Sequence, residues 1–299
     1  MPTSTTARRI TKKTSRTAEW TCMSRAASSL ERDPHYRSDD SIAAQLAPHG
    51  IVALLRTQIG KAIFRRCLAQ KGLYEYVIAR TKYIDAAFRA ALDDDFAQIV
   101  LFGAGFDTRA LRFEAHLGNT RVFELDASIT QTAKINRMRR LRLTAPPGLT
   151  FVPIDFEQES MVDKLHQAGF RNETRSLFIL EGVLMYLSPA SAHATFRSLE
   201  DLAARHSRVV FDYVRAAVVR GDGTAYGEEG LHRSVEKINE AWRFGLEPGE
   251  VKSFLALYGF ELDDHRDAAA LERMYFENEH GALVGHINNS HCIVTAERT

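Results

Sequence analysis

The stretch that most constrains the fold runs from residue 98 to 109 and reads QIVLFGAGFDTR. An apolar run of strand-forming residues ends abruptly at Gly103-x-Gly105, and a segment with helical periodicity follows. Glycine lets the backbone turn sharply and approach a ligand, because no Cβ is in the way. A lone Gly-x-Gly also occurs in ordinary turns, so the residues that follow decide its meaning. Together they predict the first strand, turn and helix of a nucleotide-binding α/β domain.

The next apolar run, residues 121–125, is followed by an acid that fits such a domain. Asp126 lies 126 − 105 = 21 residues after Gly105, where a carboxylate typically accepts hydrogen bonds from ribose hydroxyls. The third glycine of the dinucleotide fingerprint is absent, since Phe106 to Arg109 follow directly. That glycine brings helix and strand together beneath a pyrophosphate. Its absence favours S-adenosyl-L-methionine (SAM) over NAD, with a nicotinamide-dependent oxidoreductase as the alternative of another class.

The composition excludes several other classes. The 299 residues carry a formal net charge of +1, so no global field indicates a nucleic-acid or membrane partner. Three cysteines lie far apart without metal-ligand spacing, so we expect no disulfide framework, no metal site and a reduced, cytoplasmic setting. No apolar run approaches the roughly 20 residues that cross a bilayer.

The amino-terminal third is predicted to be helical. Residues 1–16 are basic and predict a flexible tail, and residues 17–95 predict a helical cap with breaks at Asp33-Pro34, Gly60 and Gly72. Residues 96–299 then predict the α/β domain that binds the cofactor. Within it, residues 214–247 are rich in glycine and charge, which predicts a substrate lid or a surface insertion.

Strands and helices alternate through the predicted α/β domain. The expected strands cover 98–102, 121–125, 150–154, 177–180 and 208–213, with late strands at 260–262 and 292–296. Repeated strand–helix units favour a parallel sheet covered on both faces, and the late pair favours an antiparallel end. The helix expected at 128–142 carries five basic residues. Without interleaved aromatic residues, we interpret it as a solvated face rather than a nucleic-acid site.

Acidic residues follow three of these strands, and the glycine turn follows the first. The acids are Glu124 with Asp126, then Asp155, then Glu181. Ligands of open parallel sheets bind outside the carboxyl ends of the strands, so these side chains are expected on one edge. We predict that Asp126 holds the ribose, that Asp155 and Phe156 flank the adenine, and that Glu181 faces the methionine end. Each acid could instead cap the following helix.

Several segments then point to one family. Residues 100–110, VLFGAGFDTRA, resemble the LGAGLDTRA signature of the leucine carboxyl methyltransferase family, which includes bacterial and fungal O-methyltransferases of polyketide pathways. Four further segments are similar to its motifs in order and spacing: Ala79-Arg80-Thr81, Phe123-Glu124-Leu125-Asp126, Pro153-Ile154-Asp155-Phe156 and the run from Glu181 to Leu187. The resemblance implies a class I SAM-dependent methyltransferase. Its Rossmann-like sheet is mostly parallel with an antiparallel last strand, and it carries an amino-terminal helical cap.

The resemblance also implies roles for single residues. Arg80 pairs with the methionine carboxylate, Gly103 and Gly105 line the cofactor turn, and the remaining cofactor residues are Asp126, Asp155, Phe156 and Glu181. Phe102 departs from the family, which usually has a small or aliphatic residue there. The amino-terminal region and residues 214–247 match only loosely. These regions normally shape the acceptor site, so the acceptor stays open.

The predicted reaction is an in-line displacement at a sulfonium, for which the protein supplies chiefly alignment. Glu181 and Tyr186 are the candidate catalytic residues. An aromatic face attracts a cation by about 0.5–2 kcal/mol, although Tyr186 could equally be a core residue. A carboxylate acceptor needs no base, whereas a hydroxyl acceptor needs one. No spacing selects among the histidines available for this role: His193, His206, His232, His286 and His291.

The predicted activity is therefore methyl transfer to an oxygen, carboxylate or hydroxyl, of a small-molecule acceptor from secondary metabolism. One alternative consumes SAM differently: the methionine amine attacks its own side chain, and this lyase releases methylthioadenosine. A further alternative is a binding protein without catalysis. The sequence leaves the oligomeric state open.

Overall fold

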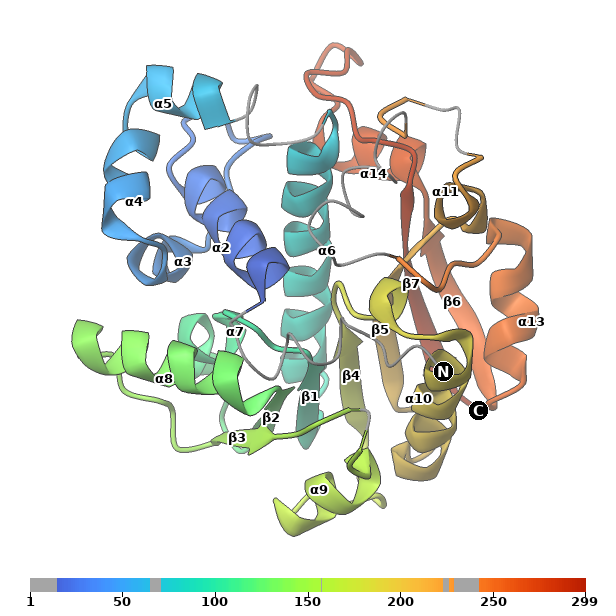
Figure 1. Cartoon of the computed structure of the whole chain (residues 1–299). Coiled ribbons are helices and arrows are strands. Elements are labelled where there is room, and N and C mark those ends of the chain that lie inside the picture. Colours follow the sequence, from blue (N-terminus) through green and yellow to red (C-terminus); the bar gives the residue numbers. More distant parts are fainter. Residues whose placement is uncertain (1–14, 65–70, 157, 223–225, 229–241) are drawn as a thin grey trace, which may run out of the picture.

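The computed structural model describes residues 15–64, 71–156, 158–222, 226–228 and 242–299 (Figure 1). Its centre is a seven-stranded sheet with the order β3-β2-β1-β4-β5-β7-β6. The strands are β1 (Gln98–Phe102), β2 (Arg121–Asp126), β3 (Leu149–Pro153), β4 (Ser176–Leu180), β5 (Arg208–Val214), β6 (Phe260–Arg266) and β7 (His291–Arg298). Strands β1 to β5 pair in parallel, and β7 pairs antiparallel with both β5 and β6. This confirms the predicted fold class.

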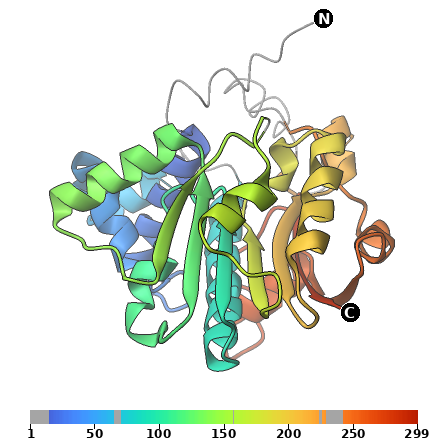
Figure 2. The same cartoon turned by 90° about the horizontal axis from the view of Figure 1, so that it is seen from below.

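Helices cover both faces of the sheet, as Figure 2 shows. Every residue of β1 and of β4 is buried, which is the pattern of central parallel strands. Alternate residues of β1 enter two different cores: Val100 and Phe102 pack on one face, and Ile99 and Leu101 on the other. The first face is covered by α9 (Met161–Gln167), α10 (Pro189–Leu202) and α13 (Val251–Ala256), and the second by α6 (Leu73–Asp93) and α14 (Ala268–Tyr275).

The residues before the sheet form a layer of helices. These are α2 (Arg16–Ser29), α3 (Ser41–Leu46), α4 (His49–Leu55), α5 (Gln58–Ile63) and α6. The predicted break at Asp33-Pro34 lies between α2 and α3, and Gly72, with φ 74°, precedes α6. The predicted break at Gly60 is wrong, because Gly60 lies inside α5. A Cβ there would come within 1.9 Å of the Leu54 carbonyl oxygen, so glycine permits close packing rather than a chain break.

The predicted tail and lid fall largely outside the described residues. Of the tail, the structure describes only residues 15 and 16. Of the stretch 214–247, it describes α11 (Ala216–Arg220), a few neighbouring residues and the segment from 242, which leads into η4 (Pro248–Glu250). The domain boundaries therefore stay predictions. None of the described helices is long and apolar enough to cross a membrane.

Candidate functional site

The glycine turn and the acid of β2 meet at the carboxyl edge of the sheet. Gly103 and Gly105 both adopt positive φ angles, 58° and 53°, which glycine tolerates without strain. The Gly105 N–H donates to Oδ2 of Asp126 over 2.5 Å, and the Ala127 N–H donates to Oδ1 over 2.6 Å. Burial raises the pKa of Asp126 to about 6, although the two backbone donors oppose this shift. The carboxylate thus lies against the turn, as the spacing predicts.

Glu181, directly after β4, lies between two guanidinium groups. Its Oε1 is 3.1 Å from Nε of Arg80, and its Oε2 accepts a 2.8 Å hydrogen bond from Nη1 of Arg109. Burial alone would raise the pKa of Glu181, but the charges of Arg109 and Arg80 prevail and lower it to about 2. Glu181 is therefore an anion at any physiological pH.

Arg80 projects from α6 and is 5% exposed. Its Nη1 donates to Oδ2 of Asp212 over 2.7 Å, while Nε faces Glu181. Asp212 also accepts hydrogen bonds from the Tyr76 hydroxyl, at 2.9 Å, and from the Gly182 N–H, at 2.6 Å. Among the described residues, the structure records no hydrogen bond or ion pair for Nη2 of Arg80, and Nε lies close to Glu181 without a hydrogen bond. Nη2 is therefore one donor of the guanidinium that a ligand could meet.

Arg109 is one of the residues of this site that the sequence interpretation missed. It is 2% exposed, its Nε donates to Asp85 over 2.8 Å, and its Nη1 contacts both Asp107 and Glu181. Its Nη2 is buried and lacks a hydrogen-bond partner within the described part of the chain. The available signal was its place in the matched DTRA segment, directly after the turn.

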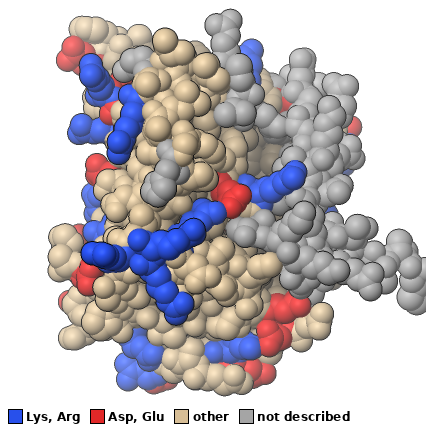
Figure 3. Space-filling view, turned by 60° about the vertical axis from the view of Figure 1, so that its left-hand side comes forward, with Lys and Arg blue, Asp and Glu red and all other residues tan. Residues whose placement is uncertain are grey.

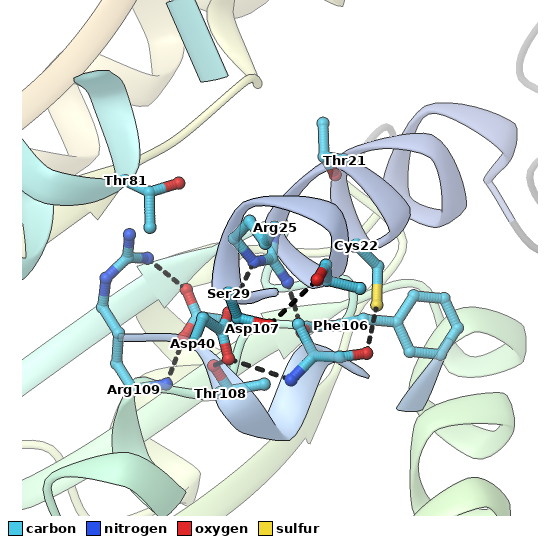
Figure 4. Close-up of polar contacts among 12 residues, drawn as sticks. Thr21, Cys22, Arg25, Ser29, Asp40, Thr81, Phe106, Asp107, Thr108 and Arg109 are labelled. Atoms are coloured by element: carbon cyan, nitrogen blue, oxygen red, sulfur yellow. Dashed lines mark hydrogen bonds and ion pairs between the residues drawn. The ribbon is translucent and has the colours of Figure 1, made fainter. Parts of the chain in front are cut away.

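The ion pairs continue into the amino-terminal helices (Figure 4). Arg25 on α2 donates to Oδ2 of Asp40 over 2.8 Å and to the Phe106 carbonyl oxygen over 2.7 Å. Asp40 also accepts a 2.7 Å hydrogen bond from the Thr108 hydroxyl. The loop after Gly105 is therefore held by residues from α2 and from the start of α3.

Counting charges shows that this buried network is not neutral. It joins four arginines to five carboxylates, which gives 4 − 5 = −1: Arg25, Arg80, Arg109 and Arg112 with Asp40, Asp85, Asp107, Glu181 and Asp212. A buried charge without a counter-charge is unfavourable. The network therefore suits a ligand with one net positive charge.

Asp155 and Phe156 lie just beyond β3, at the same edge. Asp126 is in register with Pro153, and the Ile154 N–H donates to the Asp126 carbonyl oxygen over 3.0 Å. Asp155 is half-buried, and the ring of Phe156 is 38% exposed. The structure thus brings both residues next to Asp126, and the exposed ring could stack on a flat ligand group.

The interpretation of residues 128–142 as a solvated face is wrong at one position. In α8 (Ser128–Leu141), Lys134 is buried, and its Nζ lies 2.5 Å from Oε2 of the buried Glu124. Burial raises the pKa of Glu124 to about 7 against the attraction of Lys134. The basic residues Arg139, Arg140 and Arg142 are exposed as expected, and Figure 3 shows Lys and Arg side chains gathered on the side of the molecule where α8 lies.

A second part of the site adjoins the ends of β5 and β7. Tyr186 belongs to η3 (Leu184–Tyr186) and packs with Trp242 against a small cluster that contains Met185 and Val214. The Arg243 N–H donates to the Met185 carbonyl oxygen over 2.7 Å, which fixes the segment that starts at 242 against η3. Aromatic and aliphatic side chains predominate here.

The five candidate histidines occupy different surroundings. His193 contacts the Tyr258 hydroxyl, His206 pairs with Glu297 at the surface, and His286 lies 3.6 Å from Glu272. His232 lies outside the described residues. His291, the first residue of β7, is buried and stacks on Tyr76 with ring centroids 4.4 Å apart. Of the four candidates that the structure describes, it is the one that adjoins the Arg80–Asp212 pair, through their shared neighbour Tyr76.

Comparisons with known proteins identify the family of the chain. Residues 18–200, more than half of the chain, match the family model described as leucine carboxyl methyltransferase. The chain belongs to this family. A Bacillus subtilis protein named as a candidate SAM-dependent methyltransferase, YktD, is 28% identical over 71% of this chain and 69% of its own. A similarly named protein of Mycobacteroides abscessus is 33% identical over 48% of this chain and 46% of its own.

A solved structure shows the same fold. The crystal structure of a candidate methyltransferase from Thermobifida fusca matches with a TM-score of 0.60 and 16% identity, over 86% of this chain and 94% of that one. Together with the family match, this confirms the predicted class: the chain is a SAM-dependent methyltransferase, and SAM is its cofactor.

Proposed function

We propose that this methyltransferase transfers the methyl group of SAM to an oxygen atom of a small-molecule acceptor in secondary metabolism. The observation that carries the assignment of the site is Glu181, ionised between Arg80 and Arg109 in a network with one excess negative charge. SAM carries a sulfonium, an ammonium and a carboxylate, and therefore has one net positive charge. The positive groups of the cofactor would offset the excess negative charge of the network.

The residues at the carboxyl edge fit the parts of SAM one by one. Nη2 of Arg80 would bind the methionine carboxylate, because Nη1 and Nε already face Asp212 and Glu181. Glu181 would accept hydrogen bonds from the ammonium group. Asp126 would exchange its contact with the Gly105 N–H for the ribose hydroxyls, while Gly103 keeps the turn clear of side chains.

The adenine would lie next to the end of β3. Phe156 offers an exposed ring for stacking, and Asp155 a carboxylate for the exocyclic amine. When bound, SAM supplies a methyl group that is already activated as a sulfonium. The protein's own contribution is alignment, which is worth up to roughly 7–11 kcal/mol in well-oriented systems. Tyr186, in the apolar cluster beside β5, would present its ring to the sulfonium.

Product analysis tests this function against the lyase alternative. The purified protein is incubated with SAM alone and with SAM plus a panel of phenols, alcohols and carboxylic acids, and the products are identified by mass spectrometry. Methyl transfer gives S-adenosylhomocysteine together with a methyl ether or ester, and only when an acceptor is present. Release of methylthioadenosine from SAM alone would instead support cyclisation of the methionine moiety.

A further inference from the structure

We infer that His291 binds the acceptor by accepting a hydrogen bond from its hydroxyl group and then takes the hydroxyl proton as the methyl group is transferred. The inference rests on the proposed function and narrows it to hydroxyl acceptors on an aromatic ring. In this step the acceptor oxygen bonds to the methyl carbon while the carbon–sulfur bond breaks. The sulfonium becomes a neutral thioether, and the proton passes to Nε2 of His291 and from there to water.

The position of His291 relative to the cofactor site supports this role. Its ring stacks on Tyr76, with an interplanar angle of 26°. Tyr76 precedes Arg80 by one helical turn of α6, and both donate to Oδ2 of Asp212. His291 is thus separated by one aromatic ring from the arginine that we assign to the methionine carboxylate.

Hydrogen bonds fix the tautomer of this imidazole. The Ser290 hydroxyl donates its one hydrogen to Oδ1 of Asn288 over 2.6 Å. The 2.7 Å contact between Ser290 Oγ and Nδ1 of His291 must then have the histidine as donor. Nδ1 carries the proton, and Nε2 keeps a lone pair. Within the described residues, the structure records one hydrogen bond for the imidazole ring of His291, the contact of Nδ1 with Ser290.

The charge state of His291 agrees with an acceptor role. Burial, together with the nearby charge of Arg80, lowers the pKa of His291 to about 3, so the ring is neutral and its lone pair is available. A weakly basic imidazole is sufficient, since the hydroxyl oxygen becomes far more acidic once its bond to the methyl group forms.

The surroundings of His291 define the chemical class of the acceptor. Trp242 meets the imidazole edge-on, with centroids 5.2 Å apart, and Tyr76 covers its face. The Trp242 Nε1 is buried and has no hydrogen-bond partner in the described part of the chain, so it can donate to a second polar atom of a ligand. An acceptor with a flat ring and a hydroxyl group fits Tyr76, Trp242 and the lone pair of His291.

Ligand binding to the complex with S-adenosylhomocysteine tests the inference independently of turnover. The affinities of 2-naphthol and 2-naphthoate are measured by calorimetry for the wild type, His291→Phe, His291→Gln and Ser290→Ala. Phenylalanine keeps the stacked ring without nitrogen, so we expect at least tenfold weaker binding of 2-naphthol and at least tenfold slower methylation. Glutamine restores an acceptor, so we expect a smaller loss. Ser290→Ala removes the hydrogen bond that fixes the tautomer of His291, so we expect severalfold weaker binding of 2-naphthol.

Two controls separate the possible failures. S-adenosylhomocysteine should bind all variants within twofold of the wild type, and the surface variant His206→Phe should bind 2-naphthol normally. Failure of the wild type to bind S-adenosylhomocysteine would reject the proposed function. If S-adenosylhomocysteine binds normally but 2-naphthol does not bind the wild type, only the inference is overturned. The inference is also overturned if 2-naphthoate binds more tightly than 2-naphthol, or if the histidine and serine variants bind 2-naphthol as the wild type does.

Discussion

The two halves of the site consist of different kinds of side chain. The half at the glycine turn is a buried network of arginines and carboxylates drawn from α2, α6, the turn and the ends of β4 and β5. The half around Tyr186, Trp242 and His291 is aromatic and aliphatic. Fixed charges suit the ammonium and carboxylate groups of SAM, which keep their charges when the methyl group is transferred. An apolar wall with a few polar atoms suits a ligand that differs from one enzyme to another.

The comparison also concerns the chain segments involved. The charged half uses residues of the matched motifs, such as Arg80, Arg109 and Glu181. Trp242 and His291, in contrast, lie beyond residue 200, where the family match ends. In the proposed assignment, the cofactor would be held mainly by residues inside the matched segment, with Asp212 outside it, and the acceptor would meet residues on both sides of its end. Substitutions in the two halves should consequently affect different measurements.

The largest effect is expected for Arg109→Leu. It leaves Asp85, Asp107 and Glu181 without their shared partner, and removing one member of a buried ion pair typically costs about 3–5 kcal/mol. Urea unfolding should show a loss of this size. Arg208→Ala removes an ion pair with Asp94 that is partly exposed and should cost less than about 1 kcal/mol. Equal losses for the two variants would show that the network does not stabilise the fold.

Arg80→Ala is expected to affect the cofactor selectively. A charge-assisted hydrogen bond contributes about 1.5–3 kcal/mol, so SAM should bind at least tenfold more weakly. Methylthioadenosine lacks the amino acid end and should bind the variant almost as well as it binds the wild type. Both affinities are measurable by calorimetry. A similar loss for both ligands would assign Arg80 to folding, through its contact with Asp212, rather than to the carboxylate.

Asp126→Ala should weaken the binding of SAM by tenfold or more, which corresponds to about 1.4 kcal/mol. Asp126→Asn should weaken it less, because the amide keeps one acceptor. The pKa of Asp126, about 6, adds a test by pH. The raised pKa means that the fold favours the protonated form, so the stability from this group declines as pH rises through 6. Cofactor binding needs the ionised form, so affinity should fall between pH 7 and pH 5 in the wild type and stay level in Asp126→Asn.

Glu124 serves as the matched control for Asp126. It lies two residues earlier on β2, but its partner is the buried Lys134. Glu124→Gln should therefore affect the free energy of unfolding more strongly than it affects the binding of SAM. If it abolishes binding while Asp126→Ala binds normally, the ribose has been assigned to the wrong acid.

The sequence predicted those features that local pattern and chain order determine. The apolar runs predicted the strands, and the positions of Asp126 at the end of β2 and of Glu181 after β4 placed both acids at one edge of the sheet. It could not predict partners that only the tertiary fold brings together, such as Asp212 with Arg80, 132 residues apart. Lys134 is a second example, because the sequence pattern of a helix does not show whether a lysine on it faces water or a buried glutamate. The sequence pattern predicts a helix break at Gly60, whereas in the structure this glycine allows close packing against the carbonyl oxygen of Leu54.

The central claim is that the charged half of the site recognises SAM and no dinucleotide. Calorimetric titration of the purified wild-type protein with SAM, S-adenosylhomocysteine and NAD tests it most directly. We expect saturable binding of SAM and S-adenosylhomocysteine with one site per chain, and no heat with NAD. Saturable binding of NAD, with no response to either sulfur nucleoside, would contradict it.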